Sequence, residues 1–302
     1  MAREICHADA ADAAELGEVI DALDHFSGDL GMGEGADFAG HWLGKLYGNR
    51  NFLLSHVLDM LKDRGAGQAA RNSYGAQVLM LHRQPGRYFI RVNFWPAADD
   101  PVLLASGANH YAYHEPHDHN FDFVTLGYHG PGYRSRWFTY DNGGVAGYAG
   151  EQVALHPAEE GGLSAGRILH YRRSIDVHEQ LPPDAMSVSI NVVAEDGSTP
   201  WRDQYFFDLG AGRIAALPTI TQGEIALRMA AILGEDGRDL AQDFARHHPS
   251  HRMRWQAWRA LGAQAEGAER QLLFEAASGD SSPLVRGAAG AMLRQMEGIT
   301  KT

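Results

Sequence analysis

The segment Tyr111–Gly132 carries the residues best suited to chemistry. It reads YAYHEPHDHNFDFVTLGYHGPG, and His117 and His119 stand two apart just before the aromatic-rich run that starts at Phe121. Side chains two apart on a β-strand point to the same side, so a strand here would present both imidazoles at one place. Because neutral imidazole is a common ligand of divalent metals, the pair predicts a metal site.

Two other interpretations of this segment are weaker. HEPH is half of a zinc-protease signature, but that signature needs two histidines four apart on a helix, and Pro116 is poorly placed in one. The other interpretation is a polar loop whose histidines bind no metal. Three histidines within six residues, leading straight into an aromatic strand, favour the metal site over such a loop.

A β-rich region surrounds the histidine pair. From about residue 76 to 209, runs of aromatic and β-branched residues are separated by turn sequences such as Gln84-Pro85-Gly86. No helical pattern alternates with these runs, so we expect an antiparallel sandwich or barrel rather than a parallel sheet. The expected strands are 77–82, 88–94, 121–128, 133–140, 152–156, 167–172, 186–193 and 204–209.

Helical patterns precede this region. Ala10–Leu23 and Phe52–Lys62 have apolar residues at helical spacing, and Asn51 is placed to cap the second helix. Between them lies the glycine-rich stretch GDLGMGEGAD (residues 28–37). A dinucleotide-binding loop comes directly after a strand, and no strand is predicted before this stretch. We therefore expect this stretch to be a flexible connection.

Helical patterns also follow the β-rich region, after Pro218. A weak repeat with a period of 32 residues matches Met253–Leu261 to Val285–Leu293. Such a repeat resembles paired HEAT-type helices, which stack to bury a shared face. An ordinary helical bundle is the alternative for the same residues.

Composition limits the class of protein. The chain has 302 residues, 44% of them hydrophobic, and a net charge of -12, which makes nucleic acid an unsuitable partner. Cys6 is the only cysteine, so neither a disulfide framework nor a cysteine-based zinc site is expected. The N-terminus lacks a signal-peptide pattern and no apolar stretch approaches eighteen residues, so we expect a cytoplasmic protein with no membrane partner.

The histidine pair resembles the first motif of the cupin superfamily, small β-barrels with a metal inside. His117 and His119 match the motif's His-x-His, and Gly127 and Gly130 lie near its closing glycine. The family's glutamate is missing, because this chain has Phe123 or Val124 at that place.

A distant histidine would complete the cupin site. In the family's second motif a histidine follows a glycine by eleven residues, and here Gly166 and His178 are twelve apart. The proline and glycine between them are replaced by Arg172-Arg173-Ser174. We favour His178 as the distant ligand, with His170 as its rival.

The resemblance implies a metal held by His117, His119 and His178, similar to the three-histidine iron centres of thiol dioxygenases. Fe(II) is the expected cofactor, with another divalent metal as the alternative. Candidates for a fourth ligand stay open: His114, Glu115 and Asp122. On strand parity Glu115 is favoured over Asp122, although Pro116 interrupts the strand.

Arginines and tyrosines on the expected strands are candidates for the rest of the site. Arg91 and Arg136 are expected to bind a substrate carboxylate, because guanidinium pairs with carboxylate through two hydrogen bonds. Tyr128 and Tyr140 are expected to act as an acid or to donate a hydrogen bond to bound dioxygen.

The expected fold is mainly β: an antiparallel cupin-type, double-stranded β-barrel over residues 76–215, between helical segments 1–75 and 216–302. The expected function is a mononuclear non-haem iron oxygenase that acts on a small polar, carboxylate-bearing substrate with dioxygen. One alternative is a ligand-sensing cupin, and another is a lyase, isomerase or hydrolase that uses zinc, nickel or manganese. For the helical segments three roles stay open: to cover the barrel, to form a homodimer, or to bind a carrier or partner protein.

Overall fold

The structure is a computed structural model that describes residues 2–5, 12–72 and 74–299 of the chain. The chain divides into two compact units, of which the first comprises Met1–Tyr140 and Leu155–Gln204. The second comprises Asp141–Ala154 and Tyr205–Thr302. The helices that precede residue 76 thus belong to the same unit as the central strands, and Cys6 lies outside the described residues.

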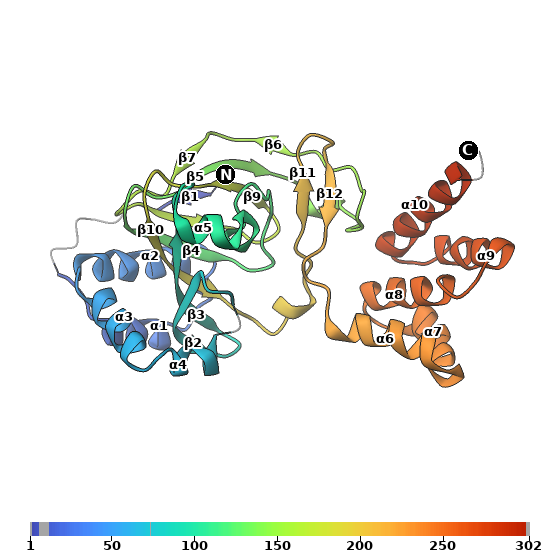
Figure 1. The fold of residues 1–302 in the computed structure, drawn as a ribbon, viewed down its shortest axis with the longest axis horizontal. Coiled ribbons are helices and arrows are strands. Elements are labelled where there is room, and N and C mark those ends of the chain that lie inside the picture. The colour runs from blue at the N-terminus through green and yellow to red at the C-terminus, as the bar shows by residue number, and fades with distance from the viewer. Residues whose placement is uncertain (1, 6–11, 73, 300–302) are drawn as a thin grey trace. The chain divides into compact units, whose positions relative to one another are not determined.

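Two antiparallel sheets form the centre of the first unit (Figure 1). Their strands are β1 (Arg3–Glu4), β2 (Val78–Gln84), β3 (Tyr88–Trp95), β4 (Phe123–His129), β5 (Arg134–Thr139), β6 (His156–Pro157), β7 (Gly161–Gly162), β8 (Ile168–Tyr171), β9 (Asp176–Leu181) and β10 (Ser187–Ala194). The six-stranded sheet has the order β1-β8-β4-β10-β3-β2, and the smaller sheet joins β6, β5 and β7, with β9 also paired to β5. Every one of these pairings is antiparallel, as the sequence predicts.

Most expected strands coincide with observed ones, but two differences matter. The segment 152–156 is largely irregular, since only its last residue belongs to a strand, β6. Conversely, β9 was not expected as a strand, although it carries His178. Its alternate residues Asp176, His178 and Gln180 are polar and nonetheless buried, so its sequence lacks the usual pattern of one apolar face.

Helices cover one face of the six-stranded sheet. They are α1 (Leu16–His25), α2 (Gly33–Gly48) and α3 (Phe52–Lys62), and two short helices, α4 (Ala66–Arg71) and α5 (Pro101–Ser106), lie in connections. Val19 of α1 and Leu43 of α2 share a hydrophobic core with Ile90 and Leu126 of the sheet, and all four are fully buried. This core fixes the helices against the sheet.

Two details of these helices differ from expectation. Because α2 begins at Gly33, the second half of the glycine-rich stretch is helical rather than a flexible connection. Gly35 is needed there, since a Cβ atom at this position would overlap the backbone of Asp29. The bounds of α3 are those predicted, but the Asn51 side chain makes no capping hydrogen bond.

Alternation along β4 separates the two cores of the first unit. Val124, Leu126 and Tyr128 belong to the core under the helices. Phe123 instead belongs to a second core, which it shares with Trp137 of the smaller sheet. The side of β4 that bears Phe123 and Thr125 therefore faces the smaller sheet.

The second unit contains a β-hairpin and a run of helices. The hairpin is β11 (Phe206–Asp208) with β12 (Arg213–Ala216), and the helices are α6 (Gln222–Leu233), α7 (Glu235–His247), α8 (His251–Gly262), α9 (Gly267–Ser278) and α10 (Pro283–Ile299). The predicted repeat falls on α8 and α10, where the matching residues Ala257 and Ala289 are both fully buried. None of the described helices is long and apolar enough to cross a membrane.

The chain is thus built of antiparallel β-sheets with flanking helices. In the described residues, helices account for more of the chain than strands do, which is more helix than a mainly β chain contains. The excess comes from the five helices of the second unit and from α1–α3.

Candidate metal centre

Three histidine side chains converge inside the first unit. The Nε2 atom of His178 lies 3.1 Å from Nε2 of His117 and 3.1 Å from Nε2 of His119. All three side chains are buried. Among the described residues, this is the one group of three or more His, Cys, Asp or Glu side chains whose potential ligand atoms lie together.

Backbone pairing brings these residues together across 61 positions of sequence. His117 and His178 form an antiparallel bridge in which each backbone N–H donates to the other's carbonyl oxygen, at 3.0 and 2.9 Å. His119 lies two residues further along, where its carbonyl oxygen accepts a hydrogen bond of 2.9 Å from the backbone N–H of Ser174. The two-residue spacing then directs both imidazoles of the pair towards His178.

The donor atoms fit a divalent metal. His117 Nδ1 lies 2.7 Å from the carbonyl oxygen of Glu115, which can only accept, so Nδ1 carries the proton and Nε2 carries the lone pair that a metal needs. Burial lowers the pKa of His117 to about 4 and holds the pKa values of His119 and His178 well below their usual range. All three are therefore neutral at pH 7, the form that binds metals.

The spacing of the nitrogens also suits a metal. Two imidazole nitrogens that bind one ion at about 2.1 Å, at nearly a right angle, are separated by about 3 Å. The Nε2 separations of 3.1 Å match this value. Two buried nitrogens, Nδ1 of His119 and Nδ1 of His178, have no hydrogen-bond partner among the described residues.

No carboxylate among the described residues joins the three nitrogens. Asp122 accepts a hydrogen bond from the Arg173 backbone N–H and forms an ion pair with its guanidinium group. His114 is exposed, and no ligand atom of Glu115 lies with the three nitrogens. Phe123, at the place of the cupin glutamate, packs its ring 4.8 Å from that of His119.

Of the two arginines predicted to bind substrate, Arg91 is the one that lies near the three histidines. Its side chain is 8% exposed, and the aromatic rings of Tyr74 and Phe121 lie 4.9 and 6.0 Å from its guanidinium carbon. The Phe121 ring also contacts the ring of His119, at 5.0 Å. Arg91 makes no ion pair with a described carboxylate, and its buried Nε has no hydrogen-bond partner. Burial accordingly lowers its pKa.

Arg136 does not reach the cluster. It lies opposite Glu179 on the β5–β9 ladder, and its guanidinium group pairs with the Glu179 carboxylate at 2.6 Å. The neighbouring pair on this ladder, Trp137 and His178, faces the interior, so Arg136 faces the other way. The guanidinium group of Arg136 therefore already has a carboxylate partner, Glu179.

Tyr128 and His170 also lie away from the cluster, under the helices. The Tyr128 hydroxyl donates to the carbonyl oxygen of Asn49 at 2.9 Å, and its ring packs on Phe52. His170 Nε2 is 2.8 Å from the carbonyl oxygen of Gly31. Both residues stand on the helix-facing side of the six-stranded sheet, so neither side chain reaches the three clustered histidines.

Tyr140 contacts the segment of the histidine pair through Asp118, on the side away from the imidazoles. Its hydroxyl donates a 2.6 Å hydrogen bond to Oδ2 of Asp118, the fully buried residue between His117 and His119. A side chain between two residues of a strand points away from them. Tyr140 therefore positions the segment and does not face the three imidazoles.

Replacing Tyr140 by phenylalanine is expected to lower the free energy of unfolding by about 1.5–3 kcal/mol, because the lost hydrogen bond goes to a buried carboxylate. Tyr128→Phe is the matched control and should cost only about 0.5–1.5 kcal/mol, because its hydroxyl binds a neutral carbonyl. Urea unfolding of both variants measures the difference. Equal losses of stability in the two variants would show that the hydrogen bond to Asp118 contributes no more than the one to a neutral carbonyl.

Tyr171 and Tyr133 are interior residues that the sequence did not single out for the site. The Tyr171 ring lies 4.8 Å from that of His178, and its hydroxyl accepts a 2.9 Å hydrogen bond from Trp137 Nε1. Burial raises the pKa of Tyr133 to about 12, so its hydroxyl stays protonated. Tyr171 lies on β8 and Tyr133 just before β5, and no local sequence pattern marks either as an interior residue.

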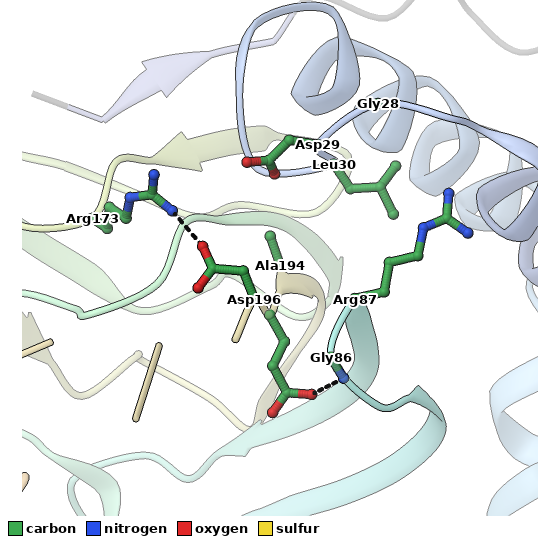
Figure 2. A pocket seen from close by; sticks show the side chains of 9 residues that line it. Gly28, Asp29, Leu30, Gly86, Arg87, Arg173, Ala194 and Asp196 are labelled. Carbon is green, nitrogen blue, oxygen red and sulfur yellow. Dashed lines mark hydrogen bonds and ion pairs between the residues drawn. The ribbon is translucent and has the colours of Figure 1, made fainter. Parts of the chain in front are cut away.

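A separate pocket of about 190 Å³ lies between Gly28–Leu30, the turn at Gly86 and the residues that follow β10 (Figure 2). Its charged groups are satisfied within the chain: Asp196 binds Arg173 and Arg202, and Glu195 binds Arg83. Asp29 accepts a hydrogen bond from the Gly31 backbone N–H. None of the three clustered histidines lines this pocket, so it is not the candidate site.

No family model and no curated protein sequence matches the chain. Partial structural likenesses include hydroquinone 1,2-dioxygenase PnpCD, at 12% identity and a TM-score of 0.25 over 43% of this chain and 71% of that one. A Pseudomonas putida prolyl-4-hydroxylase has 12% identity and a TM-score of 0.28 over 60% and 98%. The DMSP lyase DddQ from Ruegeria pomeroyi DSS-3 has 9% identity and a TM-score of 0.23 over 65% and 79%. At these scores the candidate function depends on the site itself.

Proposed function

We propose that the chain is a metalloenzyme of cupin type, a mononuclear non-haem iron oxygenase that acts on a small polar, carboxylate-bearing molecule. His117, His119 and His178 would hold Fe(II). The observation that carries the proposal is the convergence of three buried, neutral imidazoles: Nε2 of His178 lies 3.1 Å from Nε2 of each of the other two, and all three ligand atoms lie within 4.8 Å of one another. The two facing antiparallel sheets support a double-stranded barrel around them.

Three neutral ligands suit a catalytic rather than a structural site. A bound Fe(II) ion would supply the redox chemistry between dioxygen and the substrate, at positions that the three imidazoles leave open. The aromatic rings of Phe121, Phe123 and Tyr171 pack beside the imidazoles and would keep water away from them. With no carboxylate ligand, the ion's double charge stays uncompensated, which favours an anionic substrate.

The surroundings of Arg91 support the proposal that the substrate carries a carboxylate. A buried guanidinium group without a carboxylate partner is costly, because it has lost its water and gained no opposite charge. A substrate carboxylate would supply the missing partner through two hydrogen bonds. The resulting ion pair would also orient the substrate between Arg91 and the three histidines.

Metal content and nitric oxide binding test the proposal. Protein purified from iron-replete cells is expected to contain about one iron per chain, and its ferrous form should give an EPR-active nitrosyl complex, since open positions accept nitric oxide. Both measurements are independent of the substrate. His178→Ala protein serves as the control and should give neither iron nor a nitrosyl signal.

The other outcomes separate the alternatives. Full occupancy by zinc, with no nitrosyl signal from any preparation, would exclude the oxygenase and favour a non-redox enzyme at the same three histidines. A protein that takes up no metal at all, even on addition of iron(II) or zinc under anaerobic conditions, would exclude the metalloenzyme and favour a ligand-sensing protein.

A further inference from the structure

A second candidate site lies in the second unit, far in sequence from the three histidines. Side chains of α7, α8 and α9 line a partly open cavity of about 280 Å³, and its charged residues Arg238, Arg246 and Glu269 are exposed. The proposed oxygenase makes no use of this cavity. Its lining combines cationic, hydrogen-bonding and apolar groups, which together describe one kind of ligand.

The cationic groups come from one face of α7. Arg238, Gln242 and Arg246 are spaced four residues apart, so they line the cavity in a row. Arg238 donates to Oε1 of Gln264 at 3.1 Å, which holds its guanidinium group in place. Arg246 makes no hydrogen bond or ion pair with any residue that the structure describes.

A buried donor without a partner comes from α8. Trp258 lines the cavity and is 6% exposed, and its indole Nε1 has no hydrogen-bond partner among the described residues. Buried N–H groups are nearly always paired in folded proteins, because an unpaired one has lost its bond to water. A ligand with an acceptor atom would pair it.

The rest of the lining is mostly apolar. Leu261 of α8 and Leu273 of α9 supply apolar surface, and Glu269 supplies the single carboxylate. Two guanidinium groups against one carboxylate leave the cavity with a positive charge, although the chain as a whole has a net charge of -12. The cavity therefore selects an anion, and its apolar wall selects one with a hydrocarbon body.

We propose that this cavity binds a small organic acid. Its carboxylate would pair with the free guanidinium group of Arg246 and accept a hydrogen bond from the indole N–H of Trp258. Its hydrocarbon part would lie on Leu261 and Leu273. The cavity is partly open and small, about 280 Å³, which fits a small molecule better than a protein partner.

NMR of the full-length protein with ¹⁵N-labelled tryptophan tests this site with benzoate as the probe. The indole N–H signal of Trp258, assigned by its loss in Trp258→Phe, is expected to shift saturably with benzoate. Arg246→Gln should weaken the benzoate affinity about five- to tenfold, because it removes a charge-assisted pair. Arg228→Gln, a change at an exposed arginine of α6 outside the cavity, should leave the affinity unchanged.

Several outcomes would overturn the site. The absence of a saturable shift of the Trp258 signal with benzoate would exclude it, as would an equal shift with benzylamine, which carries the opposite charge. Inorganic phosphate that binds as tightly as benzoate would exclude the role of the apolar wall. Loss of iron from the three histidines would leave this result unchanged, so the site and the proposed oxygenase can fail independently.

Discussion

Replacing His178 by alanine is expected to abolish metal binding. The imidazole of His178 is the one whose Nε2 lies 3.1 Å from both other nitrogens, so its loss leaves only the pair on one segment. Even changes to residues that merely support a metal ligand lower affinity 10–100-fold, so we expect a loss of more than about 100-fold here. Metal analysis of purified protein and anaerobic titration with iron(II) measure it, and His117→Ala should behave alike.

Two other histidines provide controls for this result. His129 is exposed at the end of β4, and His129→Ala should keep full metal content. His170→Ala should also keep the metal, although it removes a buried hydrogen bond to Gly31 and lowers stability by about 1–3 kcal/mol. Metal lost from folded His170→Ala protein and retained in His178→Ala would contradict the ligand set.

Replacing Arg91 by methionine is expected to make the protein more stable and less able to bind carboxylates. Methionine fits the aromatic surroundings of Tyr74, Phe89 and Phe121 without the cost of a buried charge. Replacing buried charged groups by apolar ones of similar volume has raised stability by about 1–4 kcal/mol in other proteins. Urea unfolding of metal-free protein should show a gain of that order.

The binding half of this prediction uses the metal site as the reporter. In cobalt(II)-substituted protein, acetate is expected to perturb the visible spectrum, and Arg91→Met should weaken that response about tenfold, since a charge-assisted pair is lost. Such a gain in stability with a loss of binding is typical of a functional residue. A structural arginine would show the opposite sign in the unfolding experiment.

Arg136→Met is the matched control with the opposite expected sign. It removes the cation that pairs with the buried carboxylate of Glu179, so it should lower the free energy of unfolding by about 1–3 kcal/mol. Acetate binding at cobalt should be unchanged. If both arginine variants lose stability equally and neither alters acetate binding, the assignment of Arg91 to the substrate is wrong.

Local patterns in the sequence predicted the parts of this protein that depend on neighbouring residues. The two-residue spacing of His117 and His119 predicted that their imidazoles point the same way, and they do. Aromatic and β-branched runs with turn residues between them predicted antiparallel strands, and the apolar spacing of Phe52–Lys62 predicted α3 with its observed bounds. These features follow from strand and helix periodicity, which acts over a few residues.

Tertiary structure alone decided which distant groups meet. His170 and His178 are equally good ligands as residues, but the register of β8 turns His170 towards the helices, while the bridge from His178 to His117 brings it to the pair. Two other registers separate the arginines: that of β3 with β10 places Arg91 on the side of the histidines, and that of β5 with β9 turns Arg136 away from them. Pairing between strands tens of residues apart depends on how whole faces pack, and a shift by one residue would reverse every side chain. Sequence spacing within one segment therefore predicted the histidine pair, and only the packed sheets supplied its third member.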